Sequence, residues 1–327
     1  MAIHRHQAGT LELTAKEQFY KDVMRGLSST PKHLQSKYFY DAAGDRLFQQ
    51  IMELPEYYLT RCEQEIFVKQ TKQLTAPLLE RFDEFDVLEL GAGDATKSTH
   101  LLRYLHEYGK AFTYYPVDIS ENVIQLLESE MPQRIPGLEV QGLNGDYFDM
   151  LAKSYDLSKR NKLVLFLGSN IGNFNREEAA RFLIALNDHL QSGDLVLIGF
   201  DLKKNPKEIL AAYNDSEGIT KAFNLNLLRR INQELGADFN LTQFDHYPTY
   251  NPVSGACKSY LISLKGQEVT IGENIFSFYK YEPVWTELSQ KYSEQETDEL
   301  SLLAGFNPVT KYYDSKLRFI DALWEKL

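Results

Sequence analysis

A glycine-containing turn stands between a short apolar run and a helical pattern. The apolar run at residues 87–90 stops at Gly91 and Gly93, and a helical pattern begins near Thr96. This order is typical of a buried strand that turns sharply into a helix, where glycine leaves no Cβ in the way of a ligand. The unpaired N–H groups of such a helix start favour a polar cofactor lying against the backbone. Thr96 stands where the dinucleotide-binding pattern requires a third glycine, so a plain tight turn explains this stretch equally well.

Acidic residues follow the next two predicted strands. Asp118 ends the second strand, 27 positions beyond Gly91, and a carboxylate there can accept both ribose hydroxyls of an adenosine group. Asp146 follows the third strand and can accept the adenine amino group while Tyr147 packs against the ring. Lys97 can pair with a carboxylate, and the adenosine cofactor that carries one is S-adenosylmethionine (SAM). The plainer alternatives are a helix-capping Asp118, an Asn-Gly turn before Asp146, and a solvated Lys97.

These residues require a sheet whose strands end at one edge. Apolar runs alternate with helical patterns, and they lie at residues 87–90, 112–117, 138–140, 163–167 and 195–200. The alternation predicts an α/β fold with a parallel sheet covered by helices on both faces, where ligands bind outside the carboxyl ends of the strands. A helix opened by Ser120 is expected to stop before Pro132. A strand-like tail at residues 304–313 is expected to return to the sheet.

The rest of the chain has a different pattern. Helices without strands fill the first 60 residues: one is capped by Thr14, another ends before Pro55, and a third is capped by Thr60. After Asp201 come a polar junction, a helix that ends at Gly236, and short strands at residues 259–264 and 274–279. We therefore expect a discontinuous boundary. Residues 1–64 and 203–289 form one domain, and residues 65–202 and 290–327 form the sheet domain.

Composition limits the kinds of partner. Lys and Arg number 35 against 46 Asp and Glu, which gives a net charge of −11, and no basic run is evident. This balance argues against a nucleic-acid or anionic-membrane surface and leaves small-molecule chemistry open. Cys62 and Cys257 lie far apart without metal-ligand spacing, so we expect reduced thiols in the cytoplasm and no metal site. Residues 1–10 are polar, unlike a signal peptide or an anchor.

Several longer motifs resemble those of one enzyme family. They are KYFYD at residues 37–41, LPEYYLTR at 54–61, ELGAG at 89–93, FLGSNIGN at 166–173, AFNLN at 222–226 and TELS at 286–289, with Lys291 and Tyr292 following. With these motifs the chain resembles, over nearly its whole length, the histidine Nα-methyltransferases of ergothioneine biosynthesis, which are SAM-dependent. The resemblance implies a Rossmann-like class I methyltransferase sheet with a second, discontinuous α+β domain that binds the substrate.

The resemblance also implies a set of site residues. For SAM they are Gly91, Lys97, Asp118, Asp146 and Tyr147. For an amino-acid substrate they are Tyr57, Asn173, Tyr213, Glu287 and Ser289, with Tyr40 as the catalytic residue near the amine. The implied reaction is N-methylation of the α-amino group of free L-histidine, up to the trimethyl betaine hercynine, by a monomeric enzyme.

The implied roles are physically reasonable, although the same residues have plainer interpretations. Asn173 and Tyr213 can donate hydrogen bonds to a carboxylate, and Glu287 can accept an imidazole N–H while Ser289 serves the other nitrogen. Tyr40 or an ordered water can relay the proton that leaves the amine. Without the family, Asn173 is a loop or capping residue, and Glu287 with Ser289 is the solvated face of a strand.

Two residues depart from the family's pattern. Ser259 stands where members that prefer histidine tend to carry a methionine beside the side-chain pocket, and Trp285 stands where smaller or different residues are common. These departures leave open an N-methyltransferase for another aromatic amino acid, such as tryptophan or a derivative. From other classes, a nucleotide-cofactor oxidoreductase and a non-catalytic SAM-binding module are alternatives. The absorbance and mass of a copurified cofactor distinguish the oxidoreductase, and binding without turnover marks the module.

Overall fold

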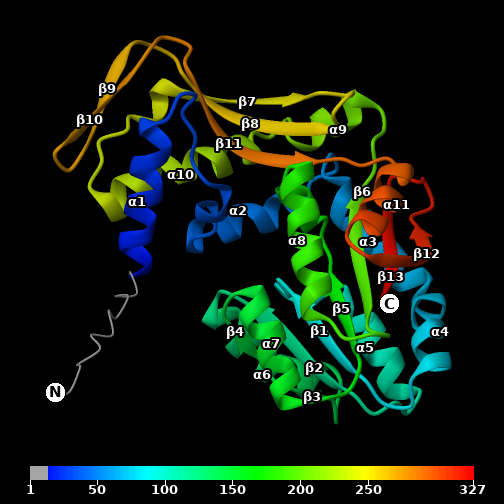
Figure 1. Ribbon diagram of the computed structural model, residues 1–327. Helices are drawn as coiled ribbons and strands as arrows, with labels where there is room; N and C mark the ends of the chain where they lie inside the picture. Colours follow the sequence, from blue (N-terminus) through cyan, green and yellow to red (C-terminus); the bar gives the residue numbers. More distant parts are fainter. Residues whose placement is uncertain (1–13) are drawn as a thin grey trace, which may run out of the picture. The chain divides into compact units, whose positions relative to one another are not determined.

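A computed structural model describes residues 14–327 of the chain (Figure 1). Residues 1–10, predicted above to be neither signal peptide nor anchor, lie outside the described residues. The described chain forms two compact units. Unit 1 contains the described residues up to Glu53 together with Tyr213–Thr249 and Lys258–Glu287, and unit 2 contains Leu54–Ala212, Tyr250–Cys257 and Leu288–Leu327. Within residues 14–327, no helix is both long enough and apolar enough to span a membrane.

Unit 2 is built on an eight-stranded sheet of order β12-β13-β6-β5-β1-β2-β3, in which the short β4 also pairs with β2 (Figure 1). The strands are β1 (Asp86–Leu90), β2 (Thr113–Asp118), β3 (Glu139–Val140), β4 (Leu143–Asn144), β5 (Lys162–Phe166), β6 (Leu195–Asp201), β12 (Phe306–Tyr313) and β13 (Phe319–Lys326). Neighbours from β6 to β3 are parallel, whereas β13 runs antiparallel to both β6 and β12. Every residue of β1, β5 and β6 is buried, which confirms the predicted sheet covered on both faces.

Helices supply that cover. They are α3 (Tyr58–Lys69), α4 (Thr71–Arg81), α5 (Ser98–Glu107), α6 (Glu121–Arg134), α7 (Tyr147–Leu157), α8 (Arg176–His189) and α11 (Glu294–Leu303). Unit 2 also contains the short helix α9 (Pro206–Ala212). On one face α5 contacts α3 and α4, and the Thr99 hydroxyl of α5 donates to the Met131 sulfur of α6 at 3.8 Å. On the other face α8 contacts α7 and α11, and the three helices share one apolar core with the strands. The parallel strands therefore all end at one edge, where the loops to the helices begin.

Unit 1 mixes helices and strands. Its helices are α1 (Ala15–Ser28), α2 (Ala42–Glu53) and α10 (Ile219–Leu235), and its hairpin consists of β9 (Gln267–Ile271) and β10 (Asn274–Phe278). Here α10 packs against α2. A three-stranded sheet has the order β11-β8-β7, from β7 (Phe244–Tyr250), β8 (Ala256–Ser263) and β11 (Pro283–Gln290). Each of these three strands contains a unit boundary, so the chain passes between the units within regular structure.

Several predicted helix ends are confirmed. Thr14 caps α1 as predicted and forms a capping box with Glu17. A second capping box, between Asn175 and Glu178, opens α8. Gly236 ends α10 with φ at +69°, a conformation that glycine adopts without strain.

Two helix predictions are wrong. The helix assigned a cap at Thr60 begins at Tyr58, because the Arg61 guanidinium donates to the carbonyls of residues 54 and 55 at 2.7 and 2.6 Å and fixes the preceding turn. The helix expected to stop before Pro132 continues to Arg134. Beyond the proline, the Ile135 N–H donates to the Met131 carbonyl at 2.9 Å, and the buried side chains of Ile124, Leu127 and Met131 hold α6 against the core.

Candidate active site

The turn after β1 contains two glycines, Gly91 and Gly93, which leave its backbone without side chains at these positions. Gly91 has φ at +71° and Gly93 at +54°, in the left-handed region that glycine tolerates. A Cβ on Gly91 would lie only 2.9 Å from the Tyr147 hydroxyl oxygen and 3.5 Å from Asn170 Nδ2. The Gly91 N–H donates to the Val117 carbonyl of β2 at 2.8 Å, which fixes the turn against the next strand. The turn is therefore bare backbone beside two polar side chains.

Asp118 ends β2 beside this turn. Its carboxylate accepts the Ser120 backbone N–H at 2.9 Å and also interacts with the N–H groups of Gly93 and Ile119. Burial raises the pKa of Asp118, and these N–H groups offset only part of that effect. The N-cap of α6 is Ser120, so Asp118 is not the cap of that helix.

Asp146 and Tyr147 follow β4 at the same edge. Asp146 is the N-cap of α7 and accepts the Phe148 N–H at 3.0 Å. Burial and the charges of Asp118 and Asp146 raise the pKa of Tyr147 to about 12. Tyr147 thus lies among the other residues predicted for adenosine. These residues fit SAM. The carboxylates of Asp118 and Asp146 can accept hydrogen bonds from an adenosine, and the glycine at position 91 leaves free the space that a Cβ would fill.

Asp118→Ala is expected to weaken binding of S-adenosylhomocysteine by about 1–3 kcal/mol, because two charge-assisted hydrogen bonds to the ribose are lost. Titration calorimetry measures the change directly. Asp149→Ala is the matched control, since this exposed carboxylate of α7 is not part of the predicted site. Equal affinity of wild type and Asp118→Ala would remove Asp118 from the cofactor site.

Lys97 is held differently from the sequence-based expectation. It lies immediately before α5, and its ammonium forms an ion pair with the carboxylate of Glu63 on α3 instead of being solvated or left to a cofactor alone. The same carboxylate accepts the Gly168 N–H at 2.8 and 3.0 Å. A Cβ on Gly168 would lie 3.6 Å from Lys97 Nζ. Glu63 therefore fixes Lys97 beside the loop that follows β5, and a cofactor carboxylate at Lys97 would share its ammonium with Glu63.

Two further buried acids lie near Lys97. The Tyr114 hydroxyl donates to Glu89 of β1 at 2.6 Å, and burial raises the pKa of Glu89 to about 7. Burial and the charge of Glu63 raise the pKa of Asp321, on β13, well above its ordinary value. The sequence analysis missed these three acids. For Glu63 the available signal is an acidic residue on the otherwise apolar, buried face of α3.

Unit 2 carries three of the residues implied for the amino-acid substrate. Tyr57 occupies the N-cap position of α3, and Asn173 is the exposed last residue of the short 3-10 helix η2 (Asn170–Asn173) after β5. Ser289 lies near the end of β11, and its hydroxyl oxygen accepts from the Lys291 ammonium at 2.8 Å. Lys291 also interacts electrostatically with Tyr57. Lys291, which the sequence analysis assigned no role, therefore links two of the three residues.

Unit 1 carries the other three, Tyr40, Tyr213 and Glu287. Tyr40 is 49% exposed, and its ring meets Phe48 and Phe223 edge-on with centroids 5.7 and 5.8 Å apart. Tyr213 is buried and directly follows α9. Tyr40 therefore has its ring fixed by aromatic contacts while a large part of its surface stays accessible.

Ser259 and Trp285 both donate hydrogen bonds to Glu287. The Ser259 hydroxyl, which is buried, donates to Glu287 Oε2 at 3.0 Å. The Trp285 indole N–H donates to the Glu287 carbonyl at 2.8 Å. A methionine at position 259 could not donate this hydrogen bond. The Glu287 carboxylate is therefore oriented by a hydrogen bond that a methionine at position 259 could not provide.

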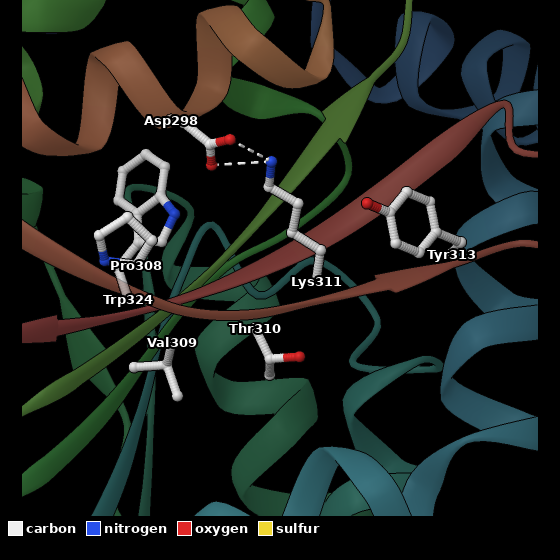
Figure 2. A pocket seen from close by; sticks show the side chains of 7 residues that line it. All are labelled: Asp298, Pro308, Val309, Thr310, Lys311, Tyr313 and Trp324. Atoms are coloured by element: carbon white, nitrogen blue, oxygen red, sulfur yellow. Dashed lines mark hydrogen bonds and ion pairs between the residues drawn. The ribbon is translucent and has the colours of Figure 1, made fainter.

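A surface hollow of about 350 Å³ lies elsewhere in unit 2 (Figure 2). It is lined by Asp298, Pro308, Val309, Thr310, Lys311, Tyr313 and Trp324. Lys311 Nζ lies 2.8 Å from Asp298 Oδ2, so an ion pair occupies part of its wall. None of the predicted site residues lines this hollow.

Comparisons with known proteins identify the family to which this chain belongs. The family model described as "Histidine-specific methyltransferase, SAM-dependent" matches residues 19–326. Histidine N-alpha-methyltransferase from Mycolicibacterium smegmatis is 35% identical over 281 residues, which cover 85% of this chain and 86% of that protein. The 4-dimethylallyltryptophan N-methyltransferase of Trichophyton verrucosum is 26% identical, covering 91% of this chain and 90% of that protein.

Among solved structures, the Burkholderia thailandensis 1,6-didemethyltoxoflavin-N1-methyltransferase with bound S-adenosylhomocysteine is 12% identical, with a TM-score of 0.41. The match covers 80% of this chain and 78% of that one. The family match spans nearly the whole chain, and the Mycolicibacterium relative shares more than a third of the aligned residues. The chain therefore belongs to the histidine-specific, SAM-dependent methyltransferase family.

Proposed function

We propose that this chain methylates the α-amino group of free L-histidine with SAM as cofactor, adding up to three methyl groups. The observation that carries the substrate assignment lies on β11, where Glu287 and Ser289 are two residues apart and so stand on one side of the strand. One side chain accepts hydrogen bonds and the other has a hydroxyl, which suits the N–H and the unprotonated nitrogen of an imidazole. The family and the 35% identical relative support the same substrate.

In this proposal the side chains bind and orient the substrate, and none of them forms a covalent bond with it. Bound SAM supplies a methyl group that its sulfonium already activates. Asn173 and Tyr213 donate to the substrate carboxylate, and Tyr40 or an ordered water relays the proton of the amine to solvent. Good orientation alone contributes on the order of 7–11 kcal/mol to such a reaction. The aromatic faces of Tyr40 and Tyr57 attract the methylated, cationic amine of the product.

We further propose that the sheet domain, residues 65–202 and 290–327, binds SAM, and that residues 1–64 and 203–289 bind the amino acid. Four residues proposed for the cofactor, Gly91, Asp118, Asp146 and Tyr147, all belong to unit 2. Tyr40, Tyr213 and Glu287 belong to unit 1, whereas Tyr57, Asn173 and Ser289 belong to unit 2 by their contacts.

The direct test incubates the purified protein with SAM and each of the twenty amino acids and records products by mass spectrometry. Histidine is expected to gain one to three methyl groups. Fragmentation in the mass spectrometer should release them together with the α-nitrogen as a methylated amine and leave an imidazole fragment without added methyl groups. A product methylated on the imidazole, or no product with any amino acid, would refute the proposal.

A second candidate substrate is tryptophan or a derivative. Ser259 favours it, since a serine leaves more room than the methionine usual in the family, and the Trichophyton relative is named for a tryptophan derivative. The Ser259 contact with Glu287 favours histidine instead, because it fixes a carboxylate in place for an N–H group. The competition experiment described in the Discussion decides between the two.

A further inference from the structure

A buried lysine, Lys291, contacts Ser289, one of the residues proposed to bind the substrate. Lys291 is wholly buried in unit 2, and its ammonium donates to Ser289 Oγ at 2.8 Å and pairs with Asp201 Oδ2 at 2.6 Å. We propose that Lys291 is a positioning residue that makes Ser289 a hydrogen-bond donor toward the substrate side chain, so that the site selects the neutral imidazole. This inference rests on the proposed function and specifies which form of histidine is bound.

The direction of the hydrogen bond follows from the groups involved. An ammonium has three donors and no acceptor, so Ser289 Oγ accepts from Lys291 and cannot donate to it. The O–H bond of Ser289 then points away from the positive charge. A neutral imidazole has one unprotonated nitrogen to accept from such a hydroxyl, whereas an imidazolium has two N–H groups and no acceptor. Ser289 held in this way therefore distinguishes the two forms.

Asp201 keeps Lys291 charged and in place. The Asp201 carboxylate is buried at the end of β6 and accepts the Tyr58 hydroxyl at 3.0 and 2.9 Å, besides the ammonium groups of Lys204 and Lys291. Burial acts to lower the pKa of Lys291, but the charge of Asp201 outweighs it and the pKa lies above the ordinary value. Two ammonium groups share this one carboxylate, and the Glu287 carboxylate proposed for the imidazole N–H offsets their remaining positive charge. Selection of the neutral imidazole therefore depends on the direction of the Ser289 hydroxyl and not on net charge.

Three other titratable groups interact with Lys291. They are Cys257 on β8 and Tyr57 before α3, and Tyr250 of β7 interacts with the same lysine. Burial raises the pKa of Tyr250, so its phenol is neutral at pH 7 and Asp201 remains the carboxylate that pairs with Lys291.

The test compares histidine with the two isomers of pyrrolylalanine, which keep one ring N–H and lack the acceptor nitrogen. The wild type is expected to favour histidine over the better isomer by about 10-fold or more in kcat/KM. Lys291→Met and Ser289→Ala should each lower this ratio about 10-fold, and the double variant should lower it no further. Lys204→Met is the matched control, because it removes an ammonium from the same carboxylate, and its ratio should equal that of the wild type.

A second readout is the affinity for histidine, measured by calorimetry with S-adenosylhomocysteine present at several pH values. Affinity of the wild type should rise as the imidazole loses its proton near pH 6.5, and Lys291→Met should flatten that dependence. Lys291→Arg keeps a charged donor and should retain part of both effects. If Lys291→Met fails to fold, Ser289→Ala and Lys291→Arg decide the question.

The outcomes separate this inference from the proposed function. Equal losses for histidine and the pyrroles in folded Lys291→Met, or an unchanged ratio in Ser289→Ala, would show that Lys291 is only structural. A wild type that methylates histidine without favouring it over the pyrroles overturns the inference and leaves the proposed function standing. A wild type that methylates no histidine overturns both.

Discussion

Glu287→Ala is expected to lower kcat/KM for histidine by about 10- to 150-fold and to leave tryptophan unaffected or improved. The change removes the acceptor of the imidazole N–H, and one charge-assisted hydrogen bond contributes roughly 1.5–3 kcal/mol. An apolar ring benefits because a desolvated carboxylate no longer faces it. Competition between histidine and tryptophan, read as relative kcat/KM for wild type and variant, measures the effect.

Two further variants define what that result means. Asn173→Ala is expected to penalise every amino acid alike, because all of them carry the α-carboxylate. Ser259→Ala keeps the Glu287 carboxylate and removes only its 3.0 Å hydrogen bond, so the loss for histidine should be smaller, about 2- to 10-fold. If Glu287→Ala lowered both substrates equally, Glu287 would be structural and the assignment of histidine would lose its main support.

Asp201→Ala is expected to lower the free energy of unfolding by about 3–5 kcal/mol. The variant leaves Lys291 and Lys204 without their shared carboxylate and the Tyr58 hydroxyl without its acceptor, in a region where all three side chains are nearly or fully buried. Chemical denaturation gives the change. Glu325→Ala is the control, since its ion pair with Arg81 is partly exposed, and the expected loss there is at most about 1 kcal/mol.

The contribution of Asp201 should also depend on pH. Burial acts to raise the pKa of Asp201, but Lys291 and Lys204 outweigh it, so the folded-state pKa lies below the ordinary value. The stabilisation is therefore complete above about pH 4 and is lost as the pH falls through the folded-state pKa. Wild type and Asp201→Ala should converge in stability under acid. A difference that stayed constant down to pH 2 would show that Asp201 acts through packing.

Local signals were enough to predict where the residues proposed for the cofactor lie in the sheet. The Gly91 turn, Asp118 at a strand end and Asp146 before a helix each follow from a few neighbouring residues, and a parallel sheet brings all strand ends to one edge. The error at Pro132 has the opposite origin, since a strong local signal was overridden by the burial of the apolar face of α6.

The buried charges could not be predicted in this way. Glu63 and the Gly168 N–H that it accepts are 105 residues apart, and Asp201 meets Lys291 from another strand. Such pairs depend on which faces of distant elements meet, and a single acidic residue in an apolar pattern does not reveal its partner. Strand β13 escaped prediction for a related reason. It carries Asp321 within an apolar run, and only its position between two strands explains why that carboxyl group is buried.

The place of β13 in the sheet also affects the chain while it is being made. β6 is fully buried in the finished sheet, yet one of its two neighbours, β13, is translated only after residues 202–318 have followed it. Until then that edge of β6 has backbone groups and apolar side chains without their partner, a condition that promotes pairing with other chains. We expect the yield of folded protein to fall when ribosomes slow within that interval, and to recover when a chaperone that binds nascent chains is supplied.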